Sequence, residues 1–297
     1  MELRHILGNT YAAMGVGATM GLYRLNDRDV VLIDTGIRQK DRADLDAMIE
    51  ENGFAVRGIF ASHAHYDHCG STAYLRRRWN AQTAAQIIEA GIAATAESYR
   101  ANYSFATYEE CRTYFAQEFF PTDVLIGTED VGVSFCGADF GILQLPGHTA
   151  GQIGIVTPDN VAYVADCVIG PSALAGSRLL TSMDIATDLK SKASLRELSC
   201  KAYILAHHDV TEDIRPIVDM NIAAVHRMTG EILDTLEDGM TCDQWRITYA
   251  GAMGFRTANA FKLGVIRRNF SSFVVYLEER GQIGVEWHAC TKHYFHR

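Results

Sequence analysis

The chain of 297 residues lacks the features that would assign it to a membrane or secreted class. No apolar run approaches the ~20 residues that a membrane-spanning helix needs. The first residues, MELRHILGNTYAAMG, have no basic stretch followed by an apolar block and a small-residue cleavage site, which is the pattern of a secretion signal. Neither an internal repeat nor a low-complexity stretch is visible. We therefore expect a globular cytoplasmic protein that does not bind membranes.

Cysteine pairs and excess basic charge are also absent. The seven cysteines are scattered and odd in number, without a C-x-x-C pair, which fits reduced thiols better than a disulfide framework. The 27 Lys and Arg residues are outnumbered by 36 Asp and Glu residues, so the net charge is −9. This balance disfavours non-specific binding to nucleic acid. We expect a small-molecule substrate instead, although residues 240–297 carry a local excess of basic residues.

What is present is an alternation of short strands and helices. GLYRL and VVLIDTG flank a polar turn and predict a hairpin, and DRADLDAMIEENG then has helical spacing. VRGIFASH predicts a buried strand and STAYLRRRW a helix, and strands return in VGVSF, FGILQL, QIGIVT, VAYVA and AYIL. Glycine-rich turns separate these strands, and helices occur at the ends of each strand block. This α/β pattern indicates two sheets covered by helices.

Two segments depart from that pattern. Residues 83–120 predict a mostly helical insertion that is dense in aromatic residues. It is either a helical hairpin packed on the core or a lid whose aromatics bind substrate, in which case Tyr99, Tyr103, Phe105 and Tyr108 are the candidate contacts. Residues 211–297 predict a helical or winged-helix-like extension of a domain formed by residues 1–210. The extension either packs on that domain or pairs two protomers in a homodimer.

A cluster of histidines and an aspartate follows the predicted strand VRGIFASH. In ASHAHYDHCGS, residues 61–71, His63 and His65 lie two apart at the strand end, so an extended backbone directs both imidazoles the same way. Asp67 and His68 follow as the chain turns into a helix, which directs them to an adjacent position. Imidazole and carboxylate ligands suit Zn, Fe, Mn or Co. The cluster therefore predicts a metal site.

The same cluster resembles the signature of the metallo-β-lactamase superfamily. Four further segments resemble that family's motifs and occur in its order, namely VLIDTG (31–36), LPGHTAGQIGI (145–155), VADCVIG (164–170) and YILAHHD (203–209). The resemblance covers roughly residues 10–210. It implies a four-layer αββα sandwich with two divalent metal ions at one edge. Zinc is the first expectation for the metal, with iron or manganese as alternatives.

The resemblance also implies a role for each matching residue. One metal ion is expected to be held by His63, His65 and His148, and the other by Asp67, His68 and His207. Asp166 would bridge the two ions, and Asp34 would orient a ligand histidine by hydrogen bonding. The family usually has Gly-His-Gly at the last ligand, whereas this chain has Ala206-His207-His208. His208 is therefore the alternative ligand or a substrate contact.

This ligand set indicates hydrolysis. Two metal ions that share a water lower its pKa to about 7 and supply hydroxide at neutral pH. Asp67, beside that water, is the candidate catalytic residue that carries its proton. No G-x-S-x-G motif for a serine nucleophile is present. The chain is accordingly interpreted as a dinuclear metal-dependent hydrolase.

The sequence is compatible with several classes of substrate and reaction. The aromatic segment and the acidic body favour a small ester, thioester or lactone. The basic C-terminal segment, which loosely resembles the extension of a superfamily branch that includes nucleases, favours a nuclease or phosphodiesterase. A mononuclear iron oxidative enzyme and a non-catalytic sensor are the remaining alternatives, because fold alone does not determine activity.

We predict that replacement of His65 by alanine abolishes metal binding and activity together, because His65 supplies a ligand that no neighbouring residue can replace. Metal content measured on the purified variant, alongside activity, checks this. A variant that keeps both its metal and its activity would refute the assignment of this site.

Overall fold

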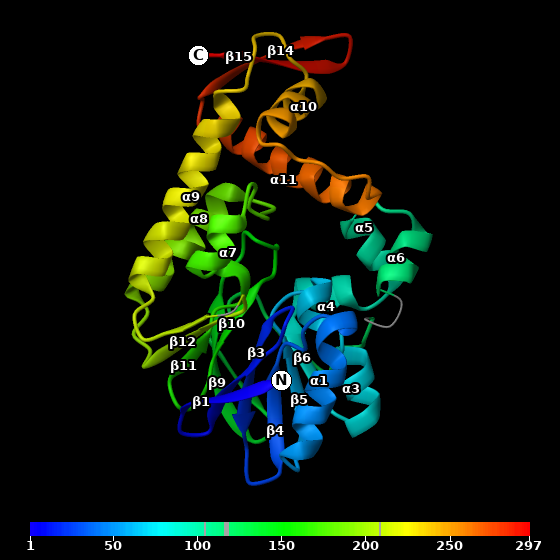
Figure 1. The fold of residues 1–297 in the computed structure, drawn as a ribbon, viewed down its shortest axis with the longest axis vertical. Coiled ribbons are helices and arrows are strands. Elements are labelled where there is room, and N and C mark those ends of the chain that lie inside the picture. The colour runs from blue at the N-terminus through cyan, green and yellow to red at the C-terminus, as the bar shows by residue number, and fades with distance from the viewer. Residues whose placement is uncertain (104, 116–118, 208) are drawn as a thin grey trace.

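The computed structural model describes residues 1–103, 105–115, 119–207 and 209–297 (Figure 1). Two mixed β-sheets pack face to face, with helices on the outside of each, so the four-layer αββα fold predicted from the sequence is confirmed. In Figure 1 this sandwich forms the lower part of the molecule, and the C-terminal helices rise above it. No helix among the described residues is long and apolar enough to cross a membrane.

The first sheet has seven strands in chain order. They are β1 (Glu2–Leu7), β2 (Thr10–Met14), β3 (Thr19–Arg24), β4 (Asp29–Ile33), β5 (Ala55–Ala61), β6 (Gln82–Gln86) and β7 (Val124–Ile126). Strands β1 to β4 pair antiparallel, and β4 to β7 pair parallel. Because the carboxyl ends of parallel strands lie at one edge of a sheet, the segments that follow β4 and β5 meet there.

The second sheet has six strands in the order β13-β12-β11-β10-β9-β8. Their bounds are β8 (Gly132–Phe135), β9 (Ala138–Gln144), β10 (Ile153–Val156), β11 (Val161–Tyr163), β12 (Ala202–Leu205) and β13 (Asp209–Thr211). Only the β11–β12 pair is parallel within this sheet as described. That pair brings the residues after β11 and β12 to the same edge, beside those that follow β4 and β5.

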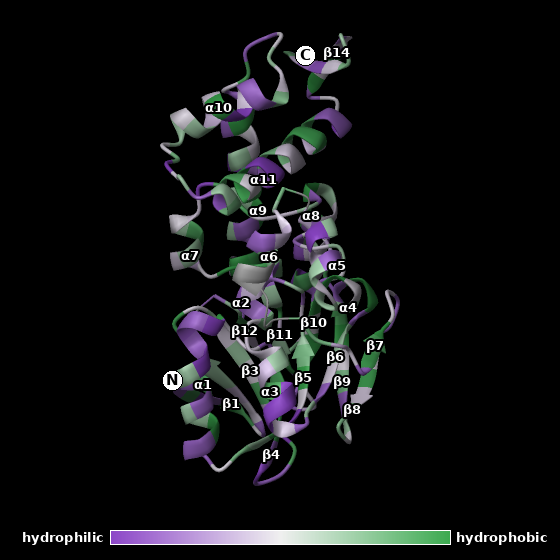
Figure 2. Ribbon diagram, turned by 90° about the vertical axis from the view of Figure 1, so that its right-hand side faces the viewer, coloured by the Kyte–Doolittle hydropathy of each residue, from purple (hydrophilic) through white to green (hydrophobic). Residues whose placement is uncertain are grey.

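Apolar side chains fill the space between the sheets and beneath the helices. Phe60 from β5 packs against Phe135 and Phe140 from the opposing sheet, with ring centroids 4.7 and 5.0 Å apart. Helices α1 (Arg38–Glu51) and α3 (Thr72–Trp79) bury apolar faces on the first sheet, and α9 (Arg215–Leu233) does so on the second. Figure 2 shows the matching alternation of hydrophilic and hydrophobic residues along α1 and α3.

The segment predicted to be helical from residue 83 begins as a strand. Residues 82–86, QTAAQ, form β6 between β5 and β7, where Thr83, Ala84 and Ala85 are buried. Alanine favours helices, but pairing with parallel strands on both sides overrides that local preference. The helical part starts at α4 (Ile87–Ala93) and continues through α5 (Ala96–Asn102) and α6 (Tyr108–Phe115).

The C-terminal third has a core of its own. It comprises α9, α10 (Cys242–Ala252), α11 (Ala260–Glu279) and the hairpin of β14 (Ile283–His288) and β15 (Thr291–His296). Trp245, Tyr249, Phe270 and Phe273 are fully buried in this core. Ile185 from α8 (Ile185–Ser194) belongs to the same core, so the packing extends across residue 210. The shorter helices α2 (Tyr66–Cys69) and α7 (Pro171–Gly176) lie at the edge of the sandwich.

The first half of α11 packs on the aromatic segment, as the position of its end beside α5 in Figure 1 illustrates. The Phe105 ring lies 5.8 Å from the Phe261 ring and covers Gly264 so closely that an added Cβ would be 2.0 Å from Phe105 Cδ2. Glycine at 264 therefore allows the two segments to approach each other.

We predict that Gly264→Ala destabilises the protein by about 1–3 kcal/mol, because the methyl group overpacks this contact. Gly230→Ala in α9 is the matched control, since a Cβ there meets no atom within 4 Å. The control should gain up to about 1 kcal/mol from helix propensity. Urea unfolding of both variants measures the free energies. A stabilised Gly264→Ala protein would contradict the contact between α11 and Phe105.

Candidate metal centre

Four loops at one edge of the sandwich carry the histidines and aspartates predicted from the sequence. His63 and His65 follow β5, and α2 then places Asp67 and His68 one turn further on. The other loops precede β10, follow β11 and follow β12. The loop before β10 contains Gly147 at a φ of 130°, where a Cβ would lie 2.3 Å from the Asp188 Cα. A side chain at 147 would therefore push this loop away from α8.

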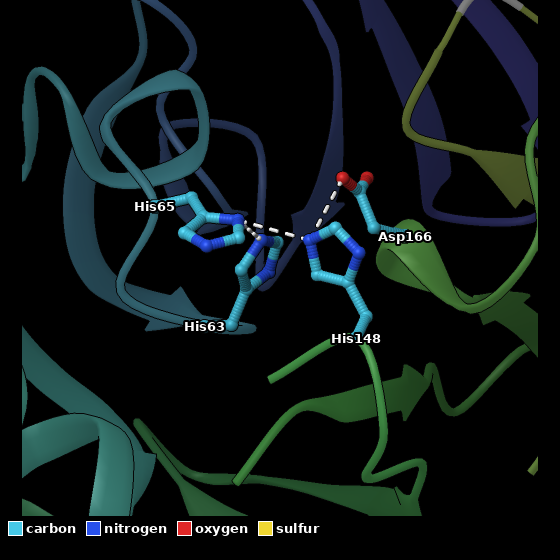
Figure 3. A group of neighbouring side chains, drawn as sticks. All are labelled: His63, His65, His148 and Asp166. Carbon is cyan, nitrogen blue, oxygen red and sulfur yellow. Dashed lines mark hydrogen bonds and ion pairs between the residues drawn. The ribbon is translucent and has the colours of Figure 1, made fainter. Parts of the chain in front are cut away.

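Three imidazoles and a carboxylate form the first group (Figure 3). His63 Nε2 lies 3.0 Å from His65 Nδ1, and His148 Nε2 lies 2.9 Å from the same atom. Asp166 Oδ2 lies 3.3 Å from His148 Nε2. The ring nitrogens of three histidines thus point at one small volume, with a carboxylate at its side.

Asp67, His68 and His207 form the second group. Asp67 Oδ2 lies 3.9 Å from His68 Nε2 and 4.0 Å from His207 Nε2. Asp166 Oδ1 lies 3.2 Å from the Nε2 atoms of both histidines. The Asp166 carboxylate therefore has one oxygen beside each group. The structure thus brings together the seven side chains that the resemblance named, with Asp166 in contact with both groups.

A buried carboxylate fixes the tautomers of two of these histidines. Asp34 Oδ2 is 2.7 Å from His68 Nδ1, which must donate to it. The Ser62 hydroxyl donates to the same oxygen over 2.7 Å and so accepts from His63 Nδ1 at 3.0 Å. Because each Nδ1 donates away from the cluster, Nε2 of both rings faces the cluster and is the atom available to a metal ion.

His148 is oriented in the same way. Its Nδ1 lies 2.9 Å from the Thr181 carbonyl oxygen and donates to it, which leaves the Nε2 lone pair pointing at His65. Burial lowers the pKa of His148 to about 4, and burial lowers the pKa of His63 and His65 well below the usual value. These three rings are therefore neutral near pH 7.

The arrangement of donors fits bound cations. Lone pairs on neutral nitrogens that converge within about 3 Å repel one another unless a cation lies between them. The buried atoms His68 Nε2 and Asp166 Oδ1 lie 3.2 Å apart as an ion pair, and neither makes a well-directed hydrogen bond to another described residue. Burial alone would lower the pKa of His68, but the carboxylates of Asp166, Asp67 and Asp34 hold it well above the usual value. Such an excess of acceptors at one point suits metal ions.

Comparison with known proteins identifies the family. The model of the metallo-beta-lactamase superfamily matches residues 14–207. The chain belongs to this superfamily. Together with the intact metal-binding motifs of the two groups, membership indicates a metallohydrolase. Among curated proteins, no match was found.

Solved structures share the fold of this superfamily member. A metallo-beta-lactamase family protein from Thermus thermophilus has a TM-score of 0.73 at 18% identity, over 97% of this chain and 99% of its own. A beta-lactamase domain protein from Burkholderia ambifaria has a TM-score of 0.71 at 14% identity, over 100% and 94%. A class B3 di-zinc metallo-beta-lactamase from an Alaskan soil metagenome has a TM-score of 0.58 at 17% identity, over 76% and 92%. The first two likenesses extend through the C-terminal helices.

A further buried acid, Glu89 on α4, supports the ligand loops of this metallo-β-lactamase fold. One carboxylate oxygen accepts the Ala64 backbone N–H at 2.8 Å, between the two ligands of the H-x-H pair. The other accepts the Gly151 N–H at 2.9 Å, three residues after His148. No motif in the alanine-rich segment around residue 89 distinguishes this glutamate, so the sequence analysis missed it.

The aromatic residues proposed as substrate contacts occupy different environments. Tyr103 lies in the wall of the cavity in front of the metal centre, with its ring 6.1 Å from the His65 ring. Tyr99 stacks on Tyr103 at 4.6 Å and belongs to the packed cluster behind it. Phe105 packs on Phe261, and the exposed Tyr108 lies under the Arg100 guanidinium.

Of the four candidate contacts, Tyr103 lines the cavity, whereas Tyr99, Phe105 and Tyr108 are not among the residues of its wall. Tyr99 and Phe105 belong to the packed cluster of this segment, which favours the helical hairpin over a lid at these two positions. His208, the alternative ligand or substrate contact, lies outside the described residues.

The cavity has a volume of about 750 Å³. The metal centre forms one wall, through His65, Asp67, His148, Asp166 and His207. Much of the rest comes from α7, the loop after it and α11, including the apolar residues Leu179, Leu180, Phe261, Val265 and Ile266. No signal in the sequence indicated that α11, more than 50 residues after the last ligand, would reach this site.

We predict that Glu89→Gln weakens metal binding and lowers stability by about 1–3 kcal/mol, because the amide NH₂ faces a backbone N–H that has lost its acceptor. Glu97→Gln, an exposed glutamate on the next helix, is the matched control. Metal affinity measured by chelator competition, together with urea unfolding, checks both variants. Equal metal affinity in the two variants would show that Glu89 does not position the ligand loops.

Proposed function

We propose that the chain is a dinuclear metal-dependent hydrolase that acts on a small ester, thioester or lactone. The observation that supports this best is the position of Asp166, with one carboxylate oxygen beside each of the two donor groups. A carboxylate in that position suits two cations. Zinc is the proposed metal, since histidine and aspartate are among its usual ligands.

His63, His65 and His148 would hold one ion and Asp67, His68 and His207 the other, with Asp166 shared. When bound, such a pair of ions activates a water as the nucleophile and polarises the bond that is attacked. Proton transfer and substrate binding are then the functions of side chains around the cavity.

Asp67 is the proposed proton carrier. Its Oδ2 lies about as far from His68 Nε2 (3.9 Å) as from His207 Nε2 (4.0 Å), and the side chain lines the cavity. A carboxylate at this place can take a proton from the attacking water and deliver it to the leaving group. Asp34 keeps His68 in one tautomer throughout, so proton movement is confined to the cavity side of the cluster.

The cavity supports a small and partly apolar substrate. Leu179, Leu180, Phe261, Val265 and Ile266 line it opposite the metal centre. A volume of about 750 Å³ is in the range of pockets for small molecules, which is about 300–1,000 Å³. Apolar walls of this kind favour the acyl part of an ester, thioester or lactone over a nucleic-acid strand.

We predict that protein purified without chelators contains two zinc ions per chain and hydrolyses at least one member of a panel of esters, thioesters and lactones. Asp67→Asn should lower kcat by about 10²–10⁴-fold, as expected for loss of a general base. The exposed Asp139→Asn in β9 is the control and should retain activity. Elemental analysis and initial rates provide the measurements.

Other outcomes would replace this proposal with a defined alternative. One iron ion per chain and no hydrolysis would favour an oxidative enzyme. Faster cleavage of bis-p-nitrophenyl phosphate than of every acyl substrate would favour a phosphodiesterase. Protein that binds no metal at all would be a non-catalytic binding module.

A further inference from the structure

An arginine from the C-terminal helix α11 faces the metal centre across the cavity. The Arg268 Cζ lies 4.9 Å from the centroid of the Tyr103 ring, and that ring lies 6.1 Å from the ring of His65. Arg268 is also one of the residues that line the cavity. The guanidinium is therefore placed in the cavity wall, by a helix that begins more than 50 residues after the last ligand.

The hydrogen-bonding capacity of this guanidinium is incompletely used. Its Nε and Nη1 atoms are buried and have no hydrogen-bond partner among the described residues. No ion pair joins Arg268 to an acidic side chain within the same part of the chain. By contrast Lys192, another cation of the cavity wall, is bound at 2.6 Å by both carboxylate oxygens of Asp188.

Two buried donors of a permanent cation without acceptors are costly in an isolated protein. Adjacent Nε–H and Nη–H groups of arginine match the two oxygens of a carboxylate or phosphate. The acids nearest to the cavity, Asp67 and Asp166, lie within the two metal-binding groups and do not pair with Arg268. Nε–H and Nη1–H lie on different edges of the planar group, so an oxyanion supplied by a ligand would satisfy one of them, together with Nη2–H on the same edge.

The surroundings favour a negatively charged ligand with an apolar body. Lys262 and Arg256 line the same cavity from α11 and the loop before it, and neither forms an ion pair in the described structure. Phe261, Val265 and Ile266 lie on the same stretch. Cations and apolar side chains thus alternate along one wall, opposite the metal centre.

We propose that Arg268 binds an oxyanion, a carboxylate or a phosphate, carried by the substrate at a distance from the bond that is hydrolysed. The substrate is then an anionic amphiphile with an apolar segment between its charged group and its ester, thioester or lactone bond. This inference rests on the proposed hydrolase function for the identity of that bond. Arg268 is a specificity-determining residue, and it takes no part in holding the metal ions.

The kinetic test uses two esters that differ only in a terminal carboxylate, p-nitrophenyl hexanoate and mono-p-nitrophenyl adipate. Arg268→Gln should raise KM for the adipate ester about 10–100-fold, as expected for loss of a charge-assisted hydrogen-bond pair, and leave KM for the hexanoate ester within about 2-fold. Arg268→Lys should keep part of the preference. Arg267→Gln is the matched control, because its side chain is 63% exposed and pairs with Asp243.

A second measurement does not require hydrolysis. Calorimetric titration of the metal-loaded protein with hexanoate and with hexyl phosphate should show binding that Arg268→Gln weakens about 10-fold or more and Arg267→Gln does not. The tighter of the two ligands identifies the oxyanion. Metal content equal to that of the unmodified protein shows that the substitution left the metal centre intact.

The outcomes separate this inference from the function on which it rests. Absence of all ester hydrolysis in the unmodified protein would count against the hydrolase proposal, and the titration would then decide the role of Arg268. Equal affinity for both anions in Arg268→Gln and in the unmodified protein would overturn the anion site. So would an equal loss of kcat on both esters with unchanged KM, because that pattern indicates an effect on the metal centre.

Discussion

The carboxylate of Asp34, fully buried between the two sheets, joins the fold to the metal centre. It accepts hydrogen bonds from the Ser62 backbone and hydroxyl, from His68 and from the Tyr163 hydroxyl, at 2.7–2.8 Å. Tyr163 belongs to the second sheet and the other donors follow the first, so one side chain links both layers. A buried carboxylate is tolerated only while its acceptors are occupied. Closure of the sandwich and orientation of the ligands are therefore a single constraint.

Strained backbone positions and buried side chains next to the ligands hold the ligand loops in place at this edge of the sandwich. Asp34 itself has a φ of 63°, and Ala165, which precedes Asp166, has a φ of 48°. Residues other than glycine rarely adopt such positive values. Glu89 ties together the backbones of two ligand loops, and Gly147 lets a third loop approach α8. The candidate ligands are thus positioned by side chains outside the two donor groups, which hold the donor atoms close together despite their mutual repulsion.

Much of the fold and the ligand set could be predicted because their signals are local. Strand alternation, the glycine stops and the H-x-H-x-D-H spacing each occupy a few neighbouring residues, and the structure agrees with them. Predictions were less accurate for segments whose secondary structure or side-chain position depends on tertiary packing. Residues 82–86 became β6 against their helical composition because two strands flank them. Tyr99 packs on Tyr103 and the exposed Tyr108 lies under Arg100, so neither is in the cavity wall.

The sequence by itself determined the family, the donor chemistry and the approximate grouping of the ligands, since these follow from residue types at short spacing. Tertiary structure alone decided which distant groups complete the site. Tyr163 reaches Asp34, Glu89 reaches Ala64 and Gly151, and Arg268 reaches the cavity over Tyr103. None of these contacts has a signature in sequence, because a buried hydrogen bond between segments tens of residues apart depends on how sheets and helices pack, and many sequences offer the same single donor or acceptor.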